Sequence, residues 1–307
     1  MNFFKKIRFL TAFFWVRLAG FLLCLLPFSR ALRLARPIGH FLFFILPKSR
    51  RMAVQNLKSA YGVEVSQKQI EQMARGSFVH LAEFGLEWLM MQKITKEADH
   101  FLIEVRNHER IHEELRTRKK GAIVIVSHTG NWEIMALMGG FLVAQPIDGS
   151  VYAVARPLKN PYLYEYAMKL RGGMGLQTIG KSGGVQETFQ RLRENAIVCV
   201  LADQRVSEGS VEVNFFGRPA LTTTLPAVAA LRLGTPLFFN FLHRTHADRY
   251  YMEVEGPVSI EKTGQVKKDV RRLTQKIVSR IEEEIRKHPS RWLWMHNRWR
   301  PPHGQKD

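Results

Sequence analysis

The sequence predicts an α/β fold, with a mostly parallel central sheet flanked by helices and an N-terminal membrane-anchoring helical segment. Two observations predict the sheet. Short, continuous apolar runs recur along the chain, as is typical of strands buried on both faces, and helical patterns lie between them. The predicted strands are residues 122–127, 151–155, 197–202 and 236–242. Because strands that alternate with helices usually pair in parallel, we expect helices on both faces of the sheet.

Amphipathic patterns predict the helices. Residues 50–62 form one helix, and Ser66 is a candidate N-cap for the helical stretch that follows. Residues 163–170 and 185–192 separate the predicted strands. A long helix near the C-terminus is marked by Val270, Leu273, Ile277, Ile281 and Ile285. With no internal repeat or low-complexity linker, residues 48–307 are predicted to form one catalytic domain.

The first 47 residues have the composition of a membrane anchor. Cations at 5, 6 and 8 precede an 18-residue apolar stretch, residues 9–26, in which Arg17 is the one charge. As a helix it measures roughly 27 Å, against a hydrocarbon core about 30 Å thick. The stretch has no polar face, which favours deep insertion over a surface helix. No cleavage site of a signal peptide follows. Residues 1–47 are therefore predicted to anchor the chain; the alternative is a pair of buried core helices.

The charge balance predicts an acidic partner. The chain has 46 Lys and Arg against 27 Asp and Glu, a formal net charge of +19. Such a balance fits nucleic acid, an anionic membrane surface, or an acidic protein or substrate, and charge alone does not choose among them. The two cysteines, Cys24 and Cys199, lie in apolar runs and form no disulfide framework, which favours a reducing compartment.

Residues 175–182, GLQTIGKS, match the phosphate-binding pattern G-x-x-x-x-G-K-S. In a nucleotide-binding loop the first glycine follows a buried strand and the loop wraps the phosphates. Here the first glycine follows a helical pattern, and residues 176–179 themselves resemble a short strand. A P-loop NTPase is therefore a distant alternative. A narrower hypothesis is that the amides near Gly180 and Ser182, with Lys181, hold a phosphate.

Residues 108–112, HERIH, match the zinc-protease pattern H-E-x-x-H. His108 and His112 share one helix face, as zinc binding requires. The helix is otherwise charged, with Ile111 and Leu115 as its only apolar positions, and no third ligand follows at a recognisable spacing. These features indicate a solvated surface helix, and no metal site is predicted.

The best candidate for chemistry is SHTGNWE, residues 127–133, at the carboxyl end of a predicted strand. Ligands bind at this edge of open α/β sheets. A turn precedes a helix that Asn131 is placed to cap, so Glu133 in the first helical turn is predicted to reach back to His128. A carboxylate on one imidazole nitrogen leaves the other nitrogen as a base.

No serine or cysteine nucleophile stands beside this pair, so it is predicted to activate an external hydroxyl. A second interpretation remains open on spacing alone. Glu133 would then merely complement the helix dipole, and His128 would be a hydrogen-bonded core histidine.

HTGNWE resembles the H-x4-D/E motif of the lysophospholipid acyltransferase superfamily, in the form seen in the late acyltransferases of lipid A biosynthesis (lauroyl/myristoyl type). Further blocks agree, in order, over residues 1–300. These blocks are RRMAVQNL (50–57), ARPLKNPYL (155–163), LRGGMGLQTI (170–179), LADQ (201–204), VNFFGRPALTTT (213–224) and RWLWMHNRWR (291–300). Each block is weakly specific, but the ordered set is strong.

The chain departs from the glycerolipid branch of that superfamily. Ser127 replaces the usual Asn before the histidine, and residues 206–212, VSEGSVE, lack the Arg of the F-P-E-G-T-R block. These differences favour the lipid A branch and leave mannoside, ornithine-lipid and other glycolipid acyltransferases open.

The resemblance implies acyl transfer from an acyl carrier thioester to a hydroxyl of a lipid A precursor. It implies His128 as general base, with Glu133 orienting it. Arg171 and Arg156 would hold the acceptor phosphate or the oxyanion. Asp203, as a possible anchor of Arg171, and Gln204 would belong to the same pocket.

The implied partners follow from the same resemblance. They are acidic acyl carrier protein (or CoA as donor), a phosphorylated glycolipid and the cytoplasmic face of a bacterial inner membrane, but no nucleic acid. No metal or other cofactor is implied. A non-enzymatic basic protein that binds membranes or nucleic acid is the remaining alternative.

Overall fold

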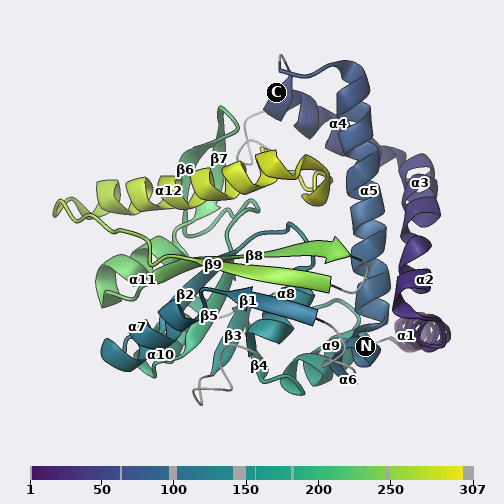
Figure 1. The fold of residues 1–307 in the computed structure, drawn as a ribbon, viewed down its shortest axis with the longest axis horizontal. Coiled ribbons are helices and arrows are strands. Elements are labelled where there is room, and N and C mark those ends of the chain that lie inside the picture. The colour runs from purple at the N-terminus through teal and green to yellow at the C-terminus, as the bar shows by residue number, and fades with distance from the viewer. Residues whose placement is uncertain are drawn as a thin grey trace.

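The computed structural model describes residues 2–62, 64–96, 102–140, 150–155, 157–180, 183–246 and 249–299. Its centre is a seven-stranded sheet in the order β1-β9-β8-β2-β5-β3-β4 (Figure 1). The strands are β1 (Leu102–Arg106), β2 (Ala122–Val126), β3 (Val151–Val154), β4 (Leu176–Ile179), β5 (Ile197–Leu201), β8 (Leu237–His246) and β9 (Arg249–Glu255). Strands β8, β2, β5, β3 and β4 are parallel, and β9 joins β8 antiparallel. The predicted mostly parallel sheet is confirmed.

Alternate residues of the central strands enter two hydrophobic cores. In β2, Ile123 and Ile125 pack on one face, and Val124 and Val126 on the other. The first face is covered by α10 (Gly184–Arg193), α11 (Leu225–Leu233) and α12 (Val266–Lys287). The second is covered by α7 (Glu109–Thr117) and α8 (Trp132–Met138). The continuous apolar runs in the sequence therefore reflect burial on both sides.

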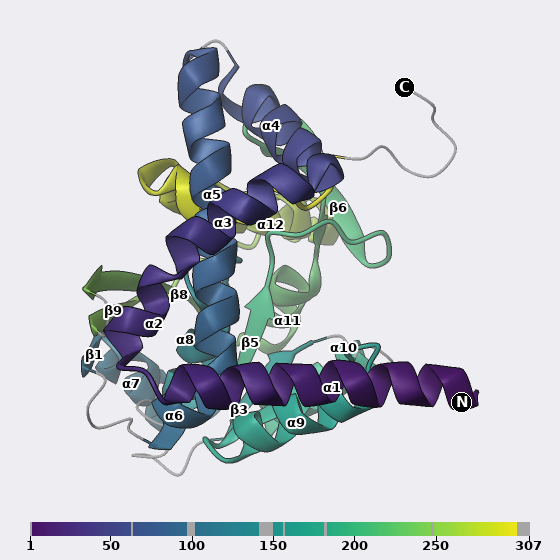
Figure 2. The same ribbon diagram turned by 90° about the vertical axis from the view of Figure 1, so that its right-hand side faces the viewer.

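The helices that precede the sheet lie along one side of the molecule (Figure 2). They are α1 (Phe3–Cys24), α2 (Phe28–Arg33), α3 (Ala35–Ile45), α4 (Pro47–Tyr61), α5 (Gln67–Leu89) and α6 (Met91–Lys96). Ser66 caps α5, and Gln69 completes a capping box, as the sequence predicts. Gly39 of α3 lies so close to α5 that a Cβ atom would stand 2.4 Å from the Cα of Val79. Helix α5 thus connects the N-terminal helices to the sheet.

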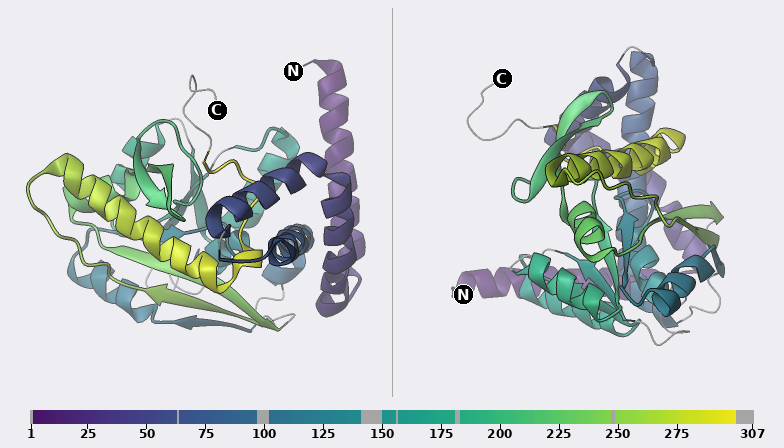
Figure 3. Two further views of the ribbon diagram at one scale, coloured as in Figure 1. Left: turned by 90° about the horizontal axis from the view of Figure 1, so that it is seen from above. Right: turned by 90° about the vertical axis from the view of Figure 1, so that its left-hand side faces the viewer.

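By length and composition, α1 is the helix among the described residues that is long and apolar enough to cross a membrane. The predicted N-terminal apolar helix is therefore present as a candidate anchor. In Figure 3, α1 (purple) lies well away from α12 (yellow-green) in both views. The amphipathic pattern of α12 is also confirmed, since Leu273, Ile277 and Ile281 are buried.

Strands β1 and β9 were not predicted from the sequence. The antiparallel hairpin of β6 (Ser210–Phe215) and β7 (Arg218–Thr223) was not predicted either. Burial alternates along β9, with Tyr250, Met252 and Val254 inside. Its charged residues interrupt the continuous apolar run that marks the central strands. A search for strands buried on both faces does not detect such a pattern.

Candidate active site

Two neighbouring strands bring His128 and Asp203 together. His128 follows β2 and Asp203 follows β5, and these strands pair in parallel, so both residues stand at the carboxyl edge of the sheet. The backbone amide of His128 donates to Oδ2 of Asp203 at 2.7 Å. Nδ1 of His128 lies 2.8 Å from Oδ1 of the same carboxylate. The edge at which ligands bind in open α/β sheets therefore carries a His–Asp pair.

Asp203 is held ionised although it is only 1% exposed. Besides the two contacts from His128, it accepts a hydrogen bond from Nε1 of Trp292 at 2.7 Å. Burial alone would raise the pKa of Asp203, but the charge of His128 and these hydrogen bonds outweigh burial and lower the pKa to about 2. An ionised carboxylate can only accept hydrogen bonds, so Nδ1 of His128 must carry the proton and donate to it. The other nitrogen, Nε2, is then unprotonated and can act as a base.

Glu133 does not orient His128 as the sequence predicted. It lies in the first turn of α8 and binds Arg171, in the last turn of α9 (Pro161–Gly172). Arg171 donates from Nε to Oε2 at 3.0 Å and from Nη2 to Oε1 at 2.5 Å. The expected partners are therefore exchanged: Asp203 was expected to hold Arg171 and instead holds His128. The exchange arises because β5 lies beside β2, whereas α8 carries Glu133 toward α9.

The turn between His128 and α8 depends on Gly130 and Asn131. Gly130 has φ of +61°, and a Cβ atom there would lie 2.5 Å from the carbonyl oxygen of Leu242. Asn131 caps α8 as predicted, and its Oδ1 accepts from the amides of Glu133 and Ile134, each at 3.0 Å. The turn thus requires glycine at one position and a capping side chain at the next.

A buried carboxylate supports this turn from α5. Glu87 is fully buried, and its Oε2 accepts a hydrogen bond from Nδ2 of Asn131 at 2.6 Å. Its Oε1 accepts one from the Tyr250 hydroxyl at 2.6 Å and also contacts Arg244. Because Glu87 is paired on both oxygens, it fixes the amide orientation of Asn131 and with it the start of α8.

A cavity of about 680 Å³ opens beside the His–Asp pair. Its polar lining includes His128, Glu133, Arg171 and Gln204. Most other lining residues are apolar. They come from the sheet, from α7, α8, α10 and α11, and from loops at the sheet edge. Strand β5 contributes Ile197, Cys199, Val200 and Leu201 to the cavity wall. At roughly 3.3 Å per residue, the cavity follows that strand over about 13 Å.

The structure brings five of the six predicted site residues to this region. Asp203 stands behind His128, while His128, Glu133, Arg171 and Gln204 line the cavity. The sixth, Arg156, lies outside the described residues. Two supporting residues were missed, Trp292 and Glu87. The aromatic C-terminal signature contains Trp292, so a signal existed for it, whereas Glu87 has no motif and reaches Asn131 only through tertiary packing.

The two competing motifs have ordinary structural roles where they are described. Residues 176–179 form β4, as expected, and pair with β3, so they are not a phosphate-wrapping loop. Lys181 and Ser182 lie outside the described residues, so the hypothesis of a phosphate held there stays a prediction. His112 lies on α7 and His108 is its N-cap; Ile111 and Leu115 are the buried residues of this surface helix.

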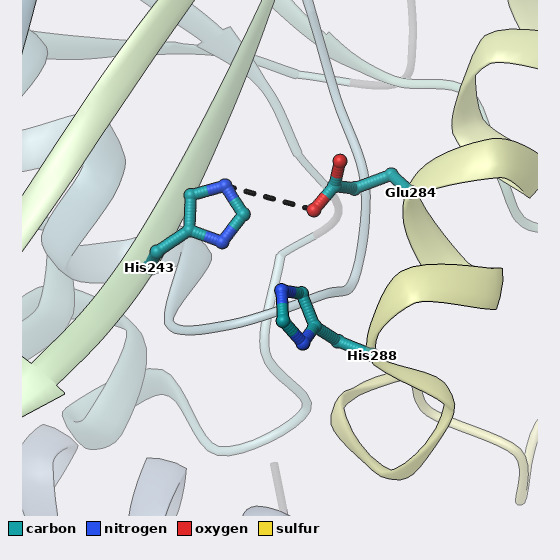
Figure 4. Close-up of side chains that lie close together, drawn as sticks. All are labelled: His243, Glu284 and His288. Carbon is teal, nitrogen blue, oxygen red and sulfur yellow. Dashed lines mark ion pairs between the residues drawn. The ribbon is translucent and has the colours of Figure 1, made fainter.

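A separate cluster of His243, Glu284 and His288 joins β8 to the end of α12 (Figure 4). Nε2 of His243 lies 3.6 Å from Oε1 of Glu284. The other oxygen of Glu284 pairs with Arg280 at 3.3 Å and Lys287 at 3.5 Å. Burial and the nearby cations lower the pKa of His243 although Glu284 opposes them. With its carboxylate shared by two cations, this cluster behaves as part of an ion-pair network between β8 and α12.

Comparison with known proteins found one family model and several curated relatives. The family model for bacterial lipid A biosynthesis acyltransferases matches residues 1–301. A phosphatidylinositol mannoside acyltransferase, found in two strains of Mycobacterium tuberculosis, is 30% identical over 183 residues, which are 58% of this chain and 54% of the relative. The protein of that name from Mycolicibacterium smegmatis is 27% identical over 187 residues, 59% of this chain and 57% of the relative. The matched segment spans little more than half of each relative.

Proposed function

The chain belongs to the family of bacterial lipid A biosynthesis acyltransferases, and on this basis we propose its substrates and mechanism. The protein transfers a fatty acyl chain from the thioester of acyl carrier protein to a hydroxyl of a phosphorylated glycolipid, a lipid A precursor. The observation that carries this proposal is the His128–Asp203 pair at the edge of a deep, mostly apolar cavity. This arrangement supplies a base beside a space suited to a hydrocarbon chain.

The proposed step begins with proton transfer from the acceptor hydroxyl to Nε2 of His128. The hydroxyl oxygen forms a bond to the thioester carbonyl carbon, and the carbonyl oxygen becomes negatively charged. When the carbon–sulfur bond breaks, the imidazolium returns its proton to the departing thiolate. Asp203 stabilises the imidazolium throughout, because its carboxylate lies 2.8 Å from Nδ1.

The Glu133–Arg171 pair has a different part in the proposal. Its two hydrogen bonds hold the guanidinium of Arg171 at the cavity, 16% exposed. There it stabilises the oxyanion or the phosphate of the acceptor, both of which attract a fixed guanidinium. Gln204, which also lines the cavity, offers an amide donor for the same purpose.

A glycosylated phospholipid is the second candidate acceptor, because the curated relatives are phosphatidylinositol mannoside acyltransferases. It offers the same groups as a lipid A precursor: a sugar hydroxyl, a phosphate and hydrocarbon chains. The chemistry at His128 would be unchanged, and only the contacts to the acceptor would differ.

The proposed location is the cytoplasmic face of the inner membrane. The apolar helix α1 supports membrane attachment, and the net charge of +19 supports an anionic surface and an acidic carrier protein. Acyl carrier protein is cytoplasmic, so the thioester would be delivered from that side.

Mass spectrometry of the products tests the proposal. Purified protein is incubated with acyl carriers of mixed chain length, as carrier-protein and CoA thioesters, and with a lipid A precursor and a mannosylated phosphatidylinositol in parallel. We expect one acyl chain to be added to the lipid A precursor by the wild type and not by His128→Ala. Acylation of the mannolipid alone would establish the second candidate. Thioester consumption that is equal in both proteins would reject His128 as the base.

A further inference from the structure

Helix α1 is docked on the catalytic domain along most of its length. At one end, Nδ2 of Asn160 donates to the carbonyl of Phe9 at 2.9 Å. At the other, Nζ of Lys93 donates to the carbonyl of Cys24 at 3.1 Å. Between them, Gly20 lies against α5, where a Cβ atom would stand 2.8 Å from the carbonyl oxygen of Leu89. One face of α1 is therefore covered by protein from Phe9 to Cys24.

The rest of the α1 surface is apolar and exposed. Its exposed large apolar side chains are Phe3, Phe4, Ile7, Leu10, Phe14, Trp15, Phe21 and Leu22. The exposed residues Ile38, Phe41, Phe44 and Ile45 continue the apolar surface on α3, which lies on the same side of the molecule in Figure 2. Exposed cations border this surface at Lys5, Lys6, Arg8, Arg30, Arg33 and Arg36. An apolar strip bordered by cations fits a bilayer leaflet that carries anionic headgroups.

The docking is incompatible with a membrane-spanning α1. The docked part, residues 9–24, measures roughly 24 Å, which leaves about 9 Å of helix at residues 3–8. A bilayer core is about 30 Å thick. Crossing it would carry the charged helix α9, with Glu165 and Lys169, into hydrocarbon. Helix α1 has no polar face because the catalytic domain covers one side of it and its exposed side chains are mostly apolar.

Arg17, the one charge in the apolar stretch, points to the domain rather than to lipid. Its guanidinium lies 4.4 Å from the centre of the Tyr166 ring, and Nη1 donates to Gln92 at 3.4 Å. It lines a cavity of about 420 Å³ between α1, α5, α6 and α9. Lys93 and Lys96 line the same cavity, and Trp88, Leu89 and Phe21 form apolar walls. As far as the described residues go, this lining contains no Asp or Glu.

We propose that α1 lies along one leaflet without crossing the bilayer, and that the cavity at Arg17 binds the phosphate of an anionic lipid in that leaflet. Arg17, Lys93 and Lys96 would bind the phosphate, while the apolar walls of the cavity would accommodate the start of the lipid chains. The inference rests on the proposed membrane location. It adds a lipid site separate from the catalytic cavity.

Cysteine labelling tests the orientation of α1. Asn2→Cys and, separately, Lys267→Cys on the exposed side of α12 are made in a Cys24→Ala/Cys199→Ala background. Sealed inside-out membrane vesicles from producing cells are treated with a membrane-impermeant maleimide. We expect both cysteines to be labelled alike, without detergent. Labelling of Asn2→Cys only after detergent, with Lys267→Cys labelled before it, would overturn the proposal. Were both variants absent from the membranes, the membrane location itself would fail.

Calorimetric titration with monomeric dihexanoylphosphatidylglycerol tests the lipid site. We expect one site that Arg17→Gln weakens at least about tenfold and Arg8→Gln, an equal loss of charge on the exposed part of α1, at most about twofold. Unchanged thermal midpoints would show that both variants fold. Equal weakening by the two variants, or equal binding of dihexanoylphosphatidylcholine, would reject the site. Equally strong binding of inorganic phosphate would indicate a phosphate site rather than a lipid site.

Discussion

The two carboxylates of the candidate active site, Asp203 and Glu133, differ in burial and in partner. Asp203 is buried behind the imidazole, accepts hydrogen bonds from His128 and Trp292, and does not line the cavity. Glu133 is 14% exposed at the side chain, lines the cavity and binds a cation. A carboxylate behind the base controls its proton, whereas one beside the substrate controls where a guanidinium stands. Glu133, the carboxylate of the H-x4-E motif, lies beside the cavity and not behind the base.

Replacing Asp203 with Asn should have the largest effect on activity. An amide in place of the carboxylate removes the charge that stabilises the imidazolium and allows the wrong tautomer of His128. The same change in serine proteases lowers kcat about 10⁴-fold, and we expect a fall of roughly 10³–10⁴-fold here. Single-turnover acyl transfer measures it. A loss of tenfold or less would mean that the His128–Asp203 contact does not serve the chemistry.

The lowered pKa of Asp203 also predicts a dependence of stability on pH. The folded-state pKa is about 2 against an ordinary value of 3.8, so ionised Asp203 stabilises the fold above pH 3.8 and this contribution is lost as pH falls through 2. At 1.36 kcal/mol per unit the contribution is about 2 kcal/mol. The free energy of unfolding of the wild type should therefore exceed that of Asp203→Asn by an amount that shrinks between pH 6 and pH 2. Urea titrations measure it, and a gap constant with pH would contradict the assignment.

The sequence identified the parts of this site whose signals are local. The apolar run of β2, the turn at Gly130 and the cap at Asn131 are all contained within about a dozen residues, and each was predicted correctly. The pairing of His128 with Asp203 spans 75 residues and depends on β5 lying next to β2. Strand order is not encoded in any one segment. The role of orienting His128 was therefore assigned to Glu133, the nearest carboxylate in sequence, instead of Asp203, the nearest in space.

The same limit applies to α1. Its hydrophobicity predicted a candidate anchor, but its docking on α6 and α9 depends on Lys93 and Asn160, which are far away in the chain. Hydropathy alone cannot distinguish a face that meets lipid from one that meets protein. Arg17, costly in a spanning helix, is the one local feature that indicated a different environment.

Replacing Glu133 with Gln should lower activity less than replacing Asp203. The change removes the charge that holds Arg171 but leaves His128 and its proton untouched. A hydrogen bond to a charged group contributes about 1.5–3 kcal/mol, so kcat/KM should fall roughly 10- to 100-fold, with no change in the pH at which the base titrates.

Arg171→Gln and the double variant provide the control for this prediction. Because Glu133 and Arg171 act as one unit, the double variant should lose little more activity than either single variant. Additive losses would show that the two residues act independently. A Glu133→Gln variant with a shifted pH profile would return Glu133 to the role of orienting His128.

The smallest effect is expected for Trp292→Phe, which tests the support behind Asp203. The change removes the Nε1 donor at 2.7 Å but keeps an aromatic, though smaller, ring and both hydrogen bonds from His128. A neutral donor contributes about 1 kcal/mol, so kcat should fall roughly fivefold.

Trp294→Phe is the matched control, because Trp294 is also buried but donates to the carbonyl of Pro289. Both variants should unfold at lower urea concentrations, and only Trp292→Phe should lose activity. An equal loss in both would mean that Trp292 serves packing alone, and that His128 suffices to keep Asp203 ionised.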